Sequence, residues 1–164
     1  MPNQNSSNQG IDNTLKIWEK TIDVQQHFND IELQIRNYTL TLFTGIMAGI
    51  GYLLKEKINI DLHGYIIPSS AVAALIGVII MCAFYFMDKY WYHKLLKGSV
   101  LHAISIENLI KSTHPEITLT SKIGEASHIK FFGLKIDSDK KYWFFYYPLI
   151  TIFFVLYIAL LKWA

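Results

Sequence analysis

Three uninterrupted apolar stretches dominate the pattern of this chain, at residues 38–54, 65–87 and 142–161. None of them contains Asp, Glu, Lys, Arg or His. A helix rises about 1.5 Å per residue, so about 20 apolar residues cross a hydrocarbon core about 30 Å thick. The first stretch, with 17 residues, is near the lower limit. We therefore predict a mainly α-helical integral membrane protein with three transmembrane helices.

The N-terminal region divides into a polar tail and an amphipathic segment. Residues 1–11 are rich in Asn, Gln and Ser and lack a basic segment leading into an apolar one, so we expect a disordered tail rather than a cleavable signal peptide. Over 12–37 the apolar residues recur about every 3.5 positions, which predicts a cytoplasmic amphipathic helix starting near Asn13 and continuous with the first span. This seam consists of Ile17, Val24, Phe28, Ile31, Ile35, Tyr38 and Leu42. It fits a coiled-coil stalk for self-association or a helix packed on its own chain, and both interpretations stay open.

The region between the second and third spans, residues 88–141, has a mixed pattern. The second span runs without Gly or Pro into the sequence DKYWYHKLL, which predicts a helix that leaves the membrane unbroken and ends before Pro115. Residues 128–137 alternate between apolar and polar side chains, with Gly133 at the centre, as in a β-hairpin. We expect a small cytoplasmic helix-plus-hairpin region here, an external loop at 55–64 and an external tail at 162–164.

Small residues recur at four-residue spacing in the first two spans. Gly45 and Gly49 form one track, and Ser69, Ala73 and Gly77 form another. Such spacing lets two transmembrane helices approach closely. We predict that these five residues mediate helix packing, within one protomer or between the protomers of a homo-oligomer. The third span has no such track, so we expect it to face lipid.

Aromatic and basic residues indicate how the chain is oriented. The aromatic residues that flank the spans predict a belt at the membrane interface, formed by Tyr90, Trp91, Tyr92, Tyr142 and Trp143. With three spans, 12 of the 15 basic residues lie on the side of the N-terminus and residues 88–141. The positive-inside rule then places the N-terminus in the cytoplasm and the C-terminus outside. We expect this orientation in a bacterial inner membrane.

Composition argues against several functional classes. The chain is 52% hydrophobic, as in small membrane proteins, and its net charge of +2 is too small to predict nucleic-acid binding. Its single cysteine, Cys82, excludes an intrachain disulfide. His93 and His102 are nine residues apart and fall on opposite faces of a helix, so we expect no metal site. We also predict no catalytic or cofactor-binding residues, because no Ser or Cys has a recognisable activating base and no phosphate-binding loop is present.

The absence of charge within the spans also bears on transport. Proton- or ion-coupled transporters usually carry ionisable residues inside the membrane, so a coupled transporter is not expected. An oligomeric pore lined by Thr and Ser side chains of the first two spans remains open. The alternative is that these hydroxyls bond their own backbone.

The sequence FYFMDKYWYHKLLKGSVLHAISIENLI, followed by LTSKIGEASHIKFFGLKI before the last span, resembles small bacterial inner-membrane proteins. The general plan is similar to that of SLATT-like transmembrane effectors of anti-phage systems. The resemblance implies an oligomeric effector that forms a pore or disrupts the membrane, with membrane lipid and a cytosolic sensor as partners. Two other hypotheses are a scaffold that docks a cytosolic partner on residues 88–137 and a small-molecule sensor using residues 114–135.

Overall fold

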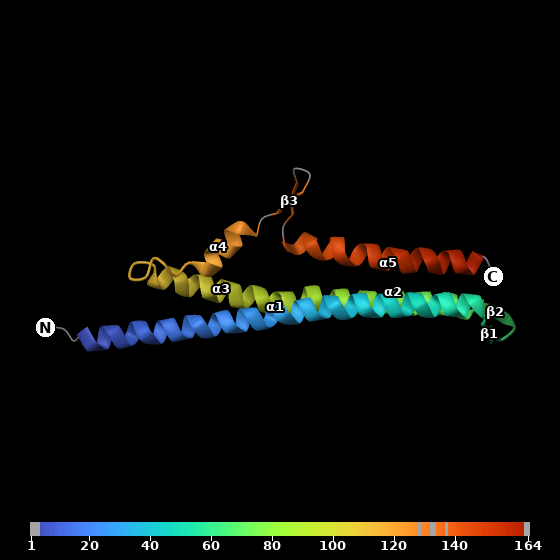
Figure 1. Ribbon diagram of the computed structural model, residues 1–164, viewed down its shortest axis with the longest axis horizontal. Coiled ribbons are helices and arrows are strands. Elements are labelled where there is room, and N and C mark those ends of the chain that lie inside the picture. Colours follow the sequence, from blue (N-terminus) through green and yellow to red (C-terminus); the bar gives the residue numbers. More distant parts are fainter. Residues whose placement is uncertain (1–3, 128, 132–133, 137, 163–164) are drawn as a thin grey trace. The chain divides into compact units, whose positions relative to one another are not determined.

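The computed structural model in Figure 1 describes residues 4–127, 129–131, 134–136 and 138–162, and these are mainly helical. The chain divides into two compact units. Met1–Glu32 and Trp91–Asp137 form one of them, called here the amphipathic unit. Leu33–Tyr90 and Ser138–Ala164 form the other, called here the apolar unit.

The first element is one long helix, α1 (Gln4–Lys55), which continues into the first apolar stretch as predicted (Figure 1). It begins nine residues before the predicted start at Asn13, so the expectation of a disordered tail is wrong from residue 4 onward, and residues 1–3 lie outside the described part. A helix, once nucleated, gains one hydrogen bond for each added residue. No proline interrupts this segment, and the Thr14 hydroxyl donates to the Gly10 carbonyl at 3.0 Å.

A tight turn ends α1. The Ile58 N–H donates to the Leu53 carbonyl and the Lys57 N–H to the Leu54 carbonyl, both at 3.3 Å. This is a Schellman motif, in which the residue after the helix adopts a left-handed conformation. Glycine is usual at that position, but here Lys57 occupies it with a φ of 49°. The turn therefore fixes a lysine just beyond the end of the apolar segment.

A two-stranded hairpin, β1 (Asn59–Leu62) and β2 (Tyr65–Pro68), links α1 to the next helix. Ile60 pairs with Ile67, and the two turn residues, His63 and Gly64, both have a positive φ. Residues 65–68 were expected to open the second transmembrane helix, and that expectation is wrong. Proline disfavours a helical conformation in the residue before it, so Pro68 keeps Ile67 extended. Pairing with β1 holds the rest of the strand.

The second helical run passes without a break from α2 (Ser69–Phe86) through a π-helical turn, η1 (Met87–Tyr92), into α3 (His93–Ile110). This confirms that the apolar helix continues into the polar segment and ends before Pro115. The sequence did not predict the π-helical turn. Such turns are often found at functional positions in longer helices.

The remaining elements are α4 (Leu119–Ala126), β3 (Ile129–Phe131), β4 (Leu134–Ile136) and α5 (Ser138–Lys162). Strands β3 and β4 pair antiparallel, with Lys130 opposite Lys135, so the predicted hairpin is confirmed for its strand residues. Its predicted turn residue, Gly133, lies outside the described residues, as do residues 163–164 of the predicted tail. Helix α5 contains the whole third apolar stretch.

The core of the apolar unit is built from α1, α2 and α5, with Ile50, Ala74, Met81 and Phe153 buried at its centre. Phe153 belongs to α5, so one face of the third apolar stretch packs into this core. That this stretch otherwise faces lipid stays a prediction. Two helical segments of the described chain, Ser69–Ile110 and Lys141–Lys162, are long and apolar enough to cross a membrane. The apolar part of α1 is not one of them.

The buried face of α1 differs from the apolar seam that the sequence predicted. Ile17, Val24 and Tyr38 of the predicted seam are exposed. The residues that α1 buries share one helical face and are Thr21, Glu32, Ile35, Thr39 and Ile50. Several of them are polar, and hydrogen bonds to neighbouring groups compensate their burial. A search for apolar periodicity alone could not select this face.

Candidate functional site

The first small-residue track lies on an open face of α1. A Cβ atom added at Gly45 or Gly49 would have no other atom of the described chain within 4 Å, and both glycines are exposed. Of the two alternatives, packing of this track inside one protomer is therefore not seen in the described chain, and packing between protomers stays a prediction. In the apolar stretch of α1, no side chain covers the backbone at these two glycines, so a second helix could approach it closely.

The second track has partners within the chain. A Cβ atom at Gly77 would lie 2.9 Å from the Phe153 ring, so the missing side chain of Gly77 makes room for an aromatic residue of α5. Ala73 is partly buried against the same core. The Ser69 N–H donates to the Ile58 carbonyl at 3.0 Å. The track thus serves packing between α2 and its own neighbours.

The threonines of the first apolar stretch bond to their own helix. The hydroxyls of Thr39, Thr41 and Thr44 each donate to the carbonyl four residues earlier, at 2.8 to 2.9 Å. This was the alternative to a polar pore lining. The hydroxyl hydrogens are therefore engaged by the backbone, and only the acceptor lone pairs and methyl groups remain for other contacts.

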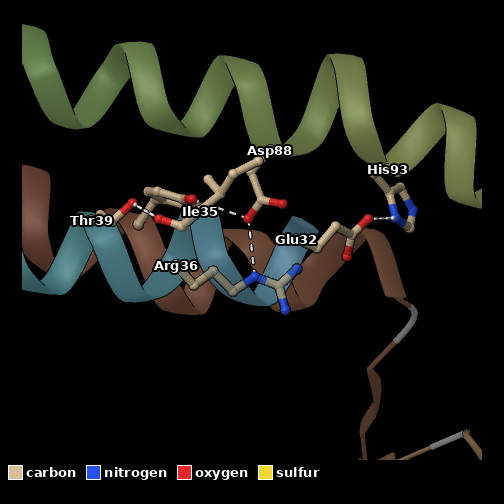
Figure 2. A network of polar contacts seen from close by, with 7 residues as sticks. Glu32, Ile35, Arg36, Thr39, Asp88 and His93 are labelled. Carbon is tan, nitrogen blue, oxygen red and sulfur yellow. Dashed lines mark hydrogen bonds and ion pairs between the residues drawn. The ribbon is translucent and has the colours of Figure 1, made fainter. Parts of the chain in front are cut away.

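A buried ion pair joins residues that flank the apolar stretches. Arg36 Nε donates to Asp88 Oδ2 at 3.0 Å (Figure 2). The Tyr146 hydroxyl donates to the same oxygen at 3.0 Å. Asp88 is 0% exposed, whereas the Arg36 side chain is 30% exposed. Asp88 lies in the π-helical turn, Arg36 in α1 and Tyr146 in α5. One carboxylate thereby connects the three helices of the apolar unit.

Reasoning from the sequence missed this cluster, because it considered charges only inside the apolar stretches. Arg36 precedes the first stretch by two residues, and Asp88 follows the second directly. Two signals pointed to Arg36: it is the only arginine of the chain, and arginine is the cation that best suits a partly buried ion pair. Nothing in the sequence selected Asp88 from the other acidic residues near helix ends.

The residues of the predicted interface belt differ in their exposure. Tyr90, Trp91 and Trp143 are exposed, and Tyr92 is half-buried. Tyr142 is buried, and the Arg36 guanidinium lies 4.9 Å from the centre of its ring. A cation over an aromatic face is stabilised by the electron-rich ring. Tyr142 therefore supports the ion pair rather than facing headgroups.

Within the amphipathic unit, Glu32 and His93 form a second polar contact. His93 Nδ1 lies 3.3 Å from Glu32 Oε1, and both side chains are largely buried (Figure 2). His102, the other histidine of this helix, does not join them, as its position on another face predicts. The described residues contain no group of three His, Cys, Asp or Glu side chains arranged to hold a metal ion.

Glu107 organises the other end of the amphipathic unit. The N–H groups of Thr120 and Ser121 donate to its carboxylate at 2.7 and 3.1 Å, and the Ser121 hydroxyl donates at 2.7 Å. The Trp18 indole also donates, at 3.4 Å. The carboxylate thus caps the first turn of α4 and ties it to α3.

These bonds predict a dependence of stability on acidity. Burial acts to raise the pKa of Glu107, but the Ser121 and Thr120 bonds outweigh it and hold the pKa below its usual 4.5. The resulting stabilisation is present above pH 4.5 and is lost as pH falls through the lowered pKa. Thermal unfolding of the protein from pH 7 to pH 3 should show this loss, and Glu107→Gln should remove it. At pH 7 the Gln variant should cost about 2 kcal/mol.

The matched control is Glu125→Gln, which changes an exposed carboxylate on α4. It should leave both the stability at neutral pH and its decline in acid unchanged. An identical pH profile for Glu107→Gln and the wild type would contradict the role of Glu107 as a cap.

No family model matches the chain, and no curated protein or solved structure is significantly similar to it.

Proposed function

We propose that this protein is an oligomeric effector of the bacterial inner membrane that forms a pore or disrupts the bilayer under the control of its amphipathic unit. In this proposal the chain crosses the membrane three times, with its N-terminus in the cytoplasm and its C-terminus outside. The biological setting we propose is anti-phage defence, as for the SLATT-like effectors that the chain resembles in plan. A cytosolic sensor protein would supply the trigger.

Three membrane crossings are supported by the packing of α1. Phe43, Ile46, Met47 and Ile50 of α1 pack into the core that α2 and α5 form. A segment that shares the core of two apolar helices, and carries no charge over residues 38–54, is suited to the same bilayer depth.

The observation that carries the proposal is the open glycine face of α1. Gly45 and Gly49 are exposed, and a side chain at either position would meet no described atom within 4 Å. Glycines on one face of a transmembrane helix let the backbone of another helix approach closely, which favours van der Waals packing between the two helices. The other track is occupied by Phe153, so the α1 face is the one left for a second copy of the chain.

Control by the amphipathic unit is supported by helix continuity. Both α1 and the run from Ser69 to Ile110 extend as single helices from the apolar unit into the amphipathic unit. A partner that binds the amphipathic unit can therefore act on Gly45 and Gly49 through a helix that continues into the apolar unit.

The test compares Gly49→Leu with Gly51→Leu. Both glycines lie in α1 with open space around them, but on different faces of the helix. The two variants therefore add the same side chain to two different faces of one helix. Gly49→Leu should weaken self-association in detergent or nanodiscs about tenfold, which corresponds to about 1.4 kcal/mol. Gly51→Leu should associate like the wild type. Analytical ultracentrifugation measures both.

The functional arm follows membrane potential with a voltage-sensitive dye in bacteria that express each variant. Depolarisation by the wild type and by Gly51→Leu, but not by Gly49→Leu, is the expected result. Equal association and equal depolarisation in all three proteins would overturn assembly through the α1 face.

A scaffold that docks a cytosolic protein is the second candidate, and a groove in the amphipathic unit favours it. The groove has a volume of about 410 Å³. Its lining comes from α1 and α3 and includes Ile17, Val24, Phe28, Leu95 and His102. Leu109 on α3 is also 77% exposed. The scaffold predicts that expression leaves the membrane potential unchanged, whereas the effector predicts its loss. The small-molecule sensor hypothesis remains a prediction from the sequence.

A further inference from the structure

One row of residues on α1 repeats at every seventh position and carries no charged or amide side chain. Its members, called here the heptad row, are Ile17, Val24, Ile31, Tyr38, Gly45 and Tyr52. Ile17 is 54% exposed, and Tyr38 and Tyr52 are each 60% exposed. Val24 and Gly45 are also exposed, and Ile31 is half-buried. The described chain therefore leaves most of this row uncovered.

The contacts of α1 within its own chain use a different face of the helix. The residues that α1 buries are Thr21, Glu32, Ile35, Thr39 and Ile50, and none of them belongs to the heptad row. At about 100° per residue they lie about 40° to 140° around the helix from the row. Packing of the protomer therefore does not account for the apolar character of the heptad row.

A second row of α1, on the opposite side of the helix, changes character along its length. Its members are Asp12, Glu19, Gln26, Leu33, Leu40, Met47 and Leu54. It is polar as far as Gln26 and apolar from Leu33 onward, as a face that meets first water and then lipid should be. The heptad row instead keeps Ile17 and Val24 in the segment where the other row is polar. An exposed apolar row of this kind is typical of a protein contact.

The seven-residue spacing is suited to contact with another helix. On a straight α-helix the row drifts about 20° per heptad, or about 100° from Ile17 to Tyr52. Two helices in a left-handed supercoil keep such a row in contact over its whole length. The row is about 50 Å long, and a contact about 10 Å wide buries roughly 1,000 Å² over both partners. That area reaches the size that a specific protein–protein interface requires.

The partner helix must suit both environments of the row, and α1 of a second copy does so. All copies enter the membrane in one orientation, and the apolar stretch 38–54 sets the depth of each. Two α1 helices therefore run parallel, with each row residue opposite its counterpart. Gly45 belongs to the row, so the open glycine face continues it into the apolar stretch. Ile17 and Val24 line the groove of the amphipathic unit, which a second copy would partly cover.

We propose that the heptad row is a self-association surface on which α1 of a second copy lies parallel and in register from Ile17 to Tyr52. This inference rests on the oligomeric membrane protein proposed above and specifies its contact. The cytoplasmic segment of α1 and the glycine face then belong to one continuous interface. The interface does not depend on the formation of a pore.

Disulfide cross-linking of the full-length protein in bacterial membranes tests the row. Cys82, the only cysteine, is first replaced by alanine. Ile17→Cys and Tyr38→Cys then place single thiols in the row. Their matched controls, Glu19→Cys and Leu40→Cys, lie two residues later on the opposite side of α1 and are exposed. A disulfide requires Cα atoms within about 7 Å, so a mild oxidant should link the row variants into dimers at least about fivefold more than the controls.

Register is tested by co-expressing an Ile17→Cys chain with a longer, tagged Val24→Cys chain. The two positions are one heptad, or about 10 Å, apart along the helix. Mixed dimers should therefore be at least about fivefold scarcer than the dimers linked at one position. Mixed dimers in equal amount would overturn the in-register contact.

The cross-links also separate this contact from the proposed function. Links at Tyr38→Cys without links at Ile17→Cys would overturn the continuous row and leave assembly through the glycine face standing. Equal links at row and control positions would report random collision and overturn the row. Links at both row positions in cells that keep their membrane potential would support the row and overturn pore formation instead.

Discussion

Replacing Asp88 by alanine should lower the free energy of unfolding by about 3 kcal/mol. The substitution removes the carboxylate that Arg36 and Tyr146 bind at 3.0 Å. Breaking a buried ion pair typically costs 3–5 kcal/mol, because the remaining charge keeps its desolvation penalty. Arg36 is 30% exposed, so water can solvate part of it and the lower end of the range applies. Chemical unfolding in detergent micelles, followed by tryptophan fluorescence, measures the change.

Asp30→Ala is the matched control for this loss, since Asp30 is an exposed aspartate of α1. It should change stability by less than about 0.5 kcal/mol. The double variant Arg36→Met with Asp88→Leu should be more stable than Asp88→Ala, because no charge is then left buried. Equal unfolding midpoints for Asp88→Ala and Asp30→Ala would show that the ion pair contributes nothing.

Gly77→Leu is expected to destabilise the fold by about 3 kcal/mol. The first added atom would lie 2.9 Å from the ring of Phe153, which is fully buried and held on several sides. Adding volume to a packed core forces side chains and backbone to move, at a typical cost of 1–3 kcal/mol, and leucine adds three carbons beyond the clashing one. Thermal unfolding of the purified protein reports this loss.

The direct test of the contact is compensation. Phe153→Ala alone leaves a cavity and should cost about 3 kcal/mol. Combined with Gly77→Leu, it should cost clearly less than the sum of the two single substitutions, because the leucine fills space that the ring vacates. Gly51→Leu, in open space, is the control for the general effect of an added leucine in an apolar helix. Additive losses in the double variant would contradict the packing of Gly77 on Phe153.

A leucine substitution is therefore expected to have different effects in the two small-residue tracks. Leucine at Gly49 should leave the isolated protomer stable and weaken assembly, whereas leucine at Gly77 should damage the protomer itself. A loss of membrane depolarisation in Gly77→Leu would report misfolding. Only the comparison of Gly49→Leu with Gly51→Leu isolates an effect of assembly.

Local patterns in the sequence were sufficient to predict several elements. The structure confirms the continuity of the second apolar helix into DKYWYHKLL, its end before Pro115, and the two paired strands of the predicted hairpin at 129–131 and 134–136. Each depends on backbone preferences and on the polarity of neighbouring residues, which act within a few positions. The early start of α1 at Gln4 and the strand at 65–68 were missed, since the first depends on propagation from a helix farther along and the second on a hairpin partner.

By itself, the sequence of this protein determined the apolar stretches, the helical character of the chain and the candidate small-residue tracks, because hydrophobicity and spacing are properties of neighbouring residues. The tertiary structure decided which face of each helix is buried. It placed Phe153 against Gly77 and left Gly49 open. It also brought Asp88 to Arg36, 52 residues apart in the chain, and Glu107 to the start of α4. Those pairings depend on where helices from distant segments meet, and no local pattern encodes the meeting point of two surfaces.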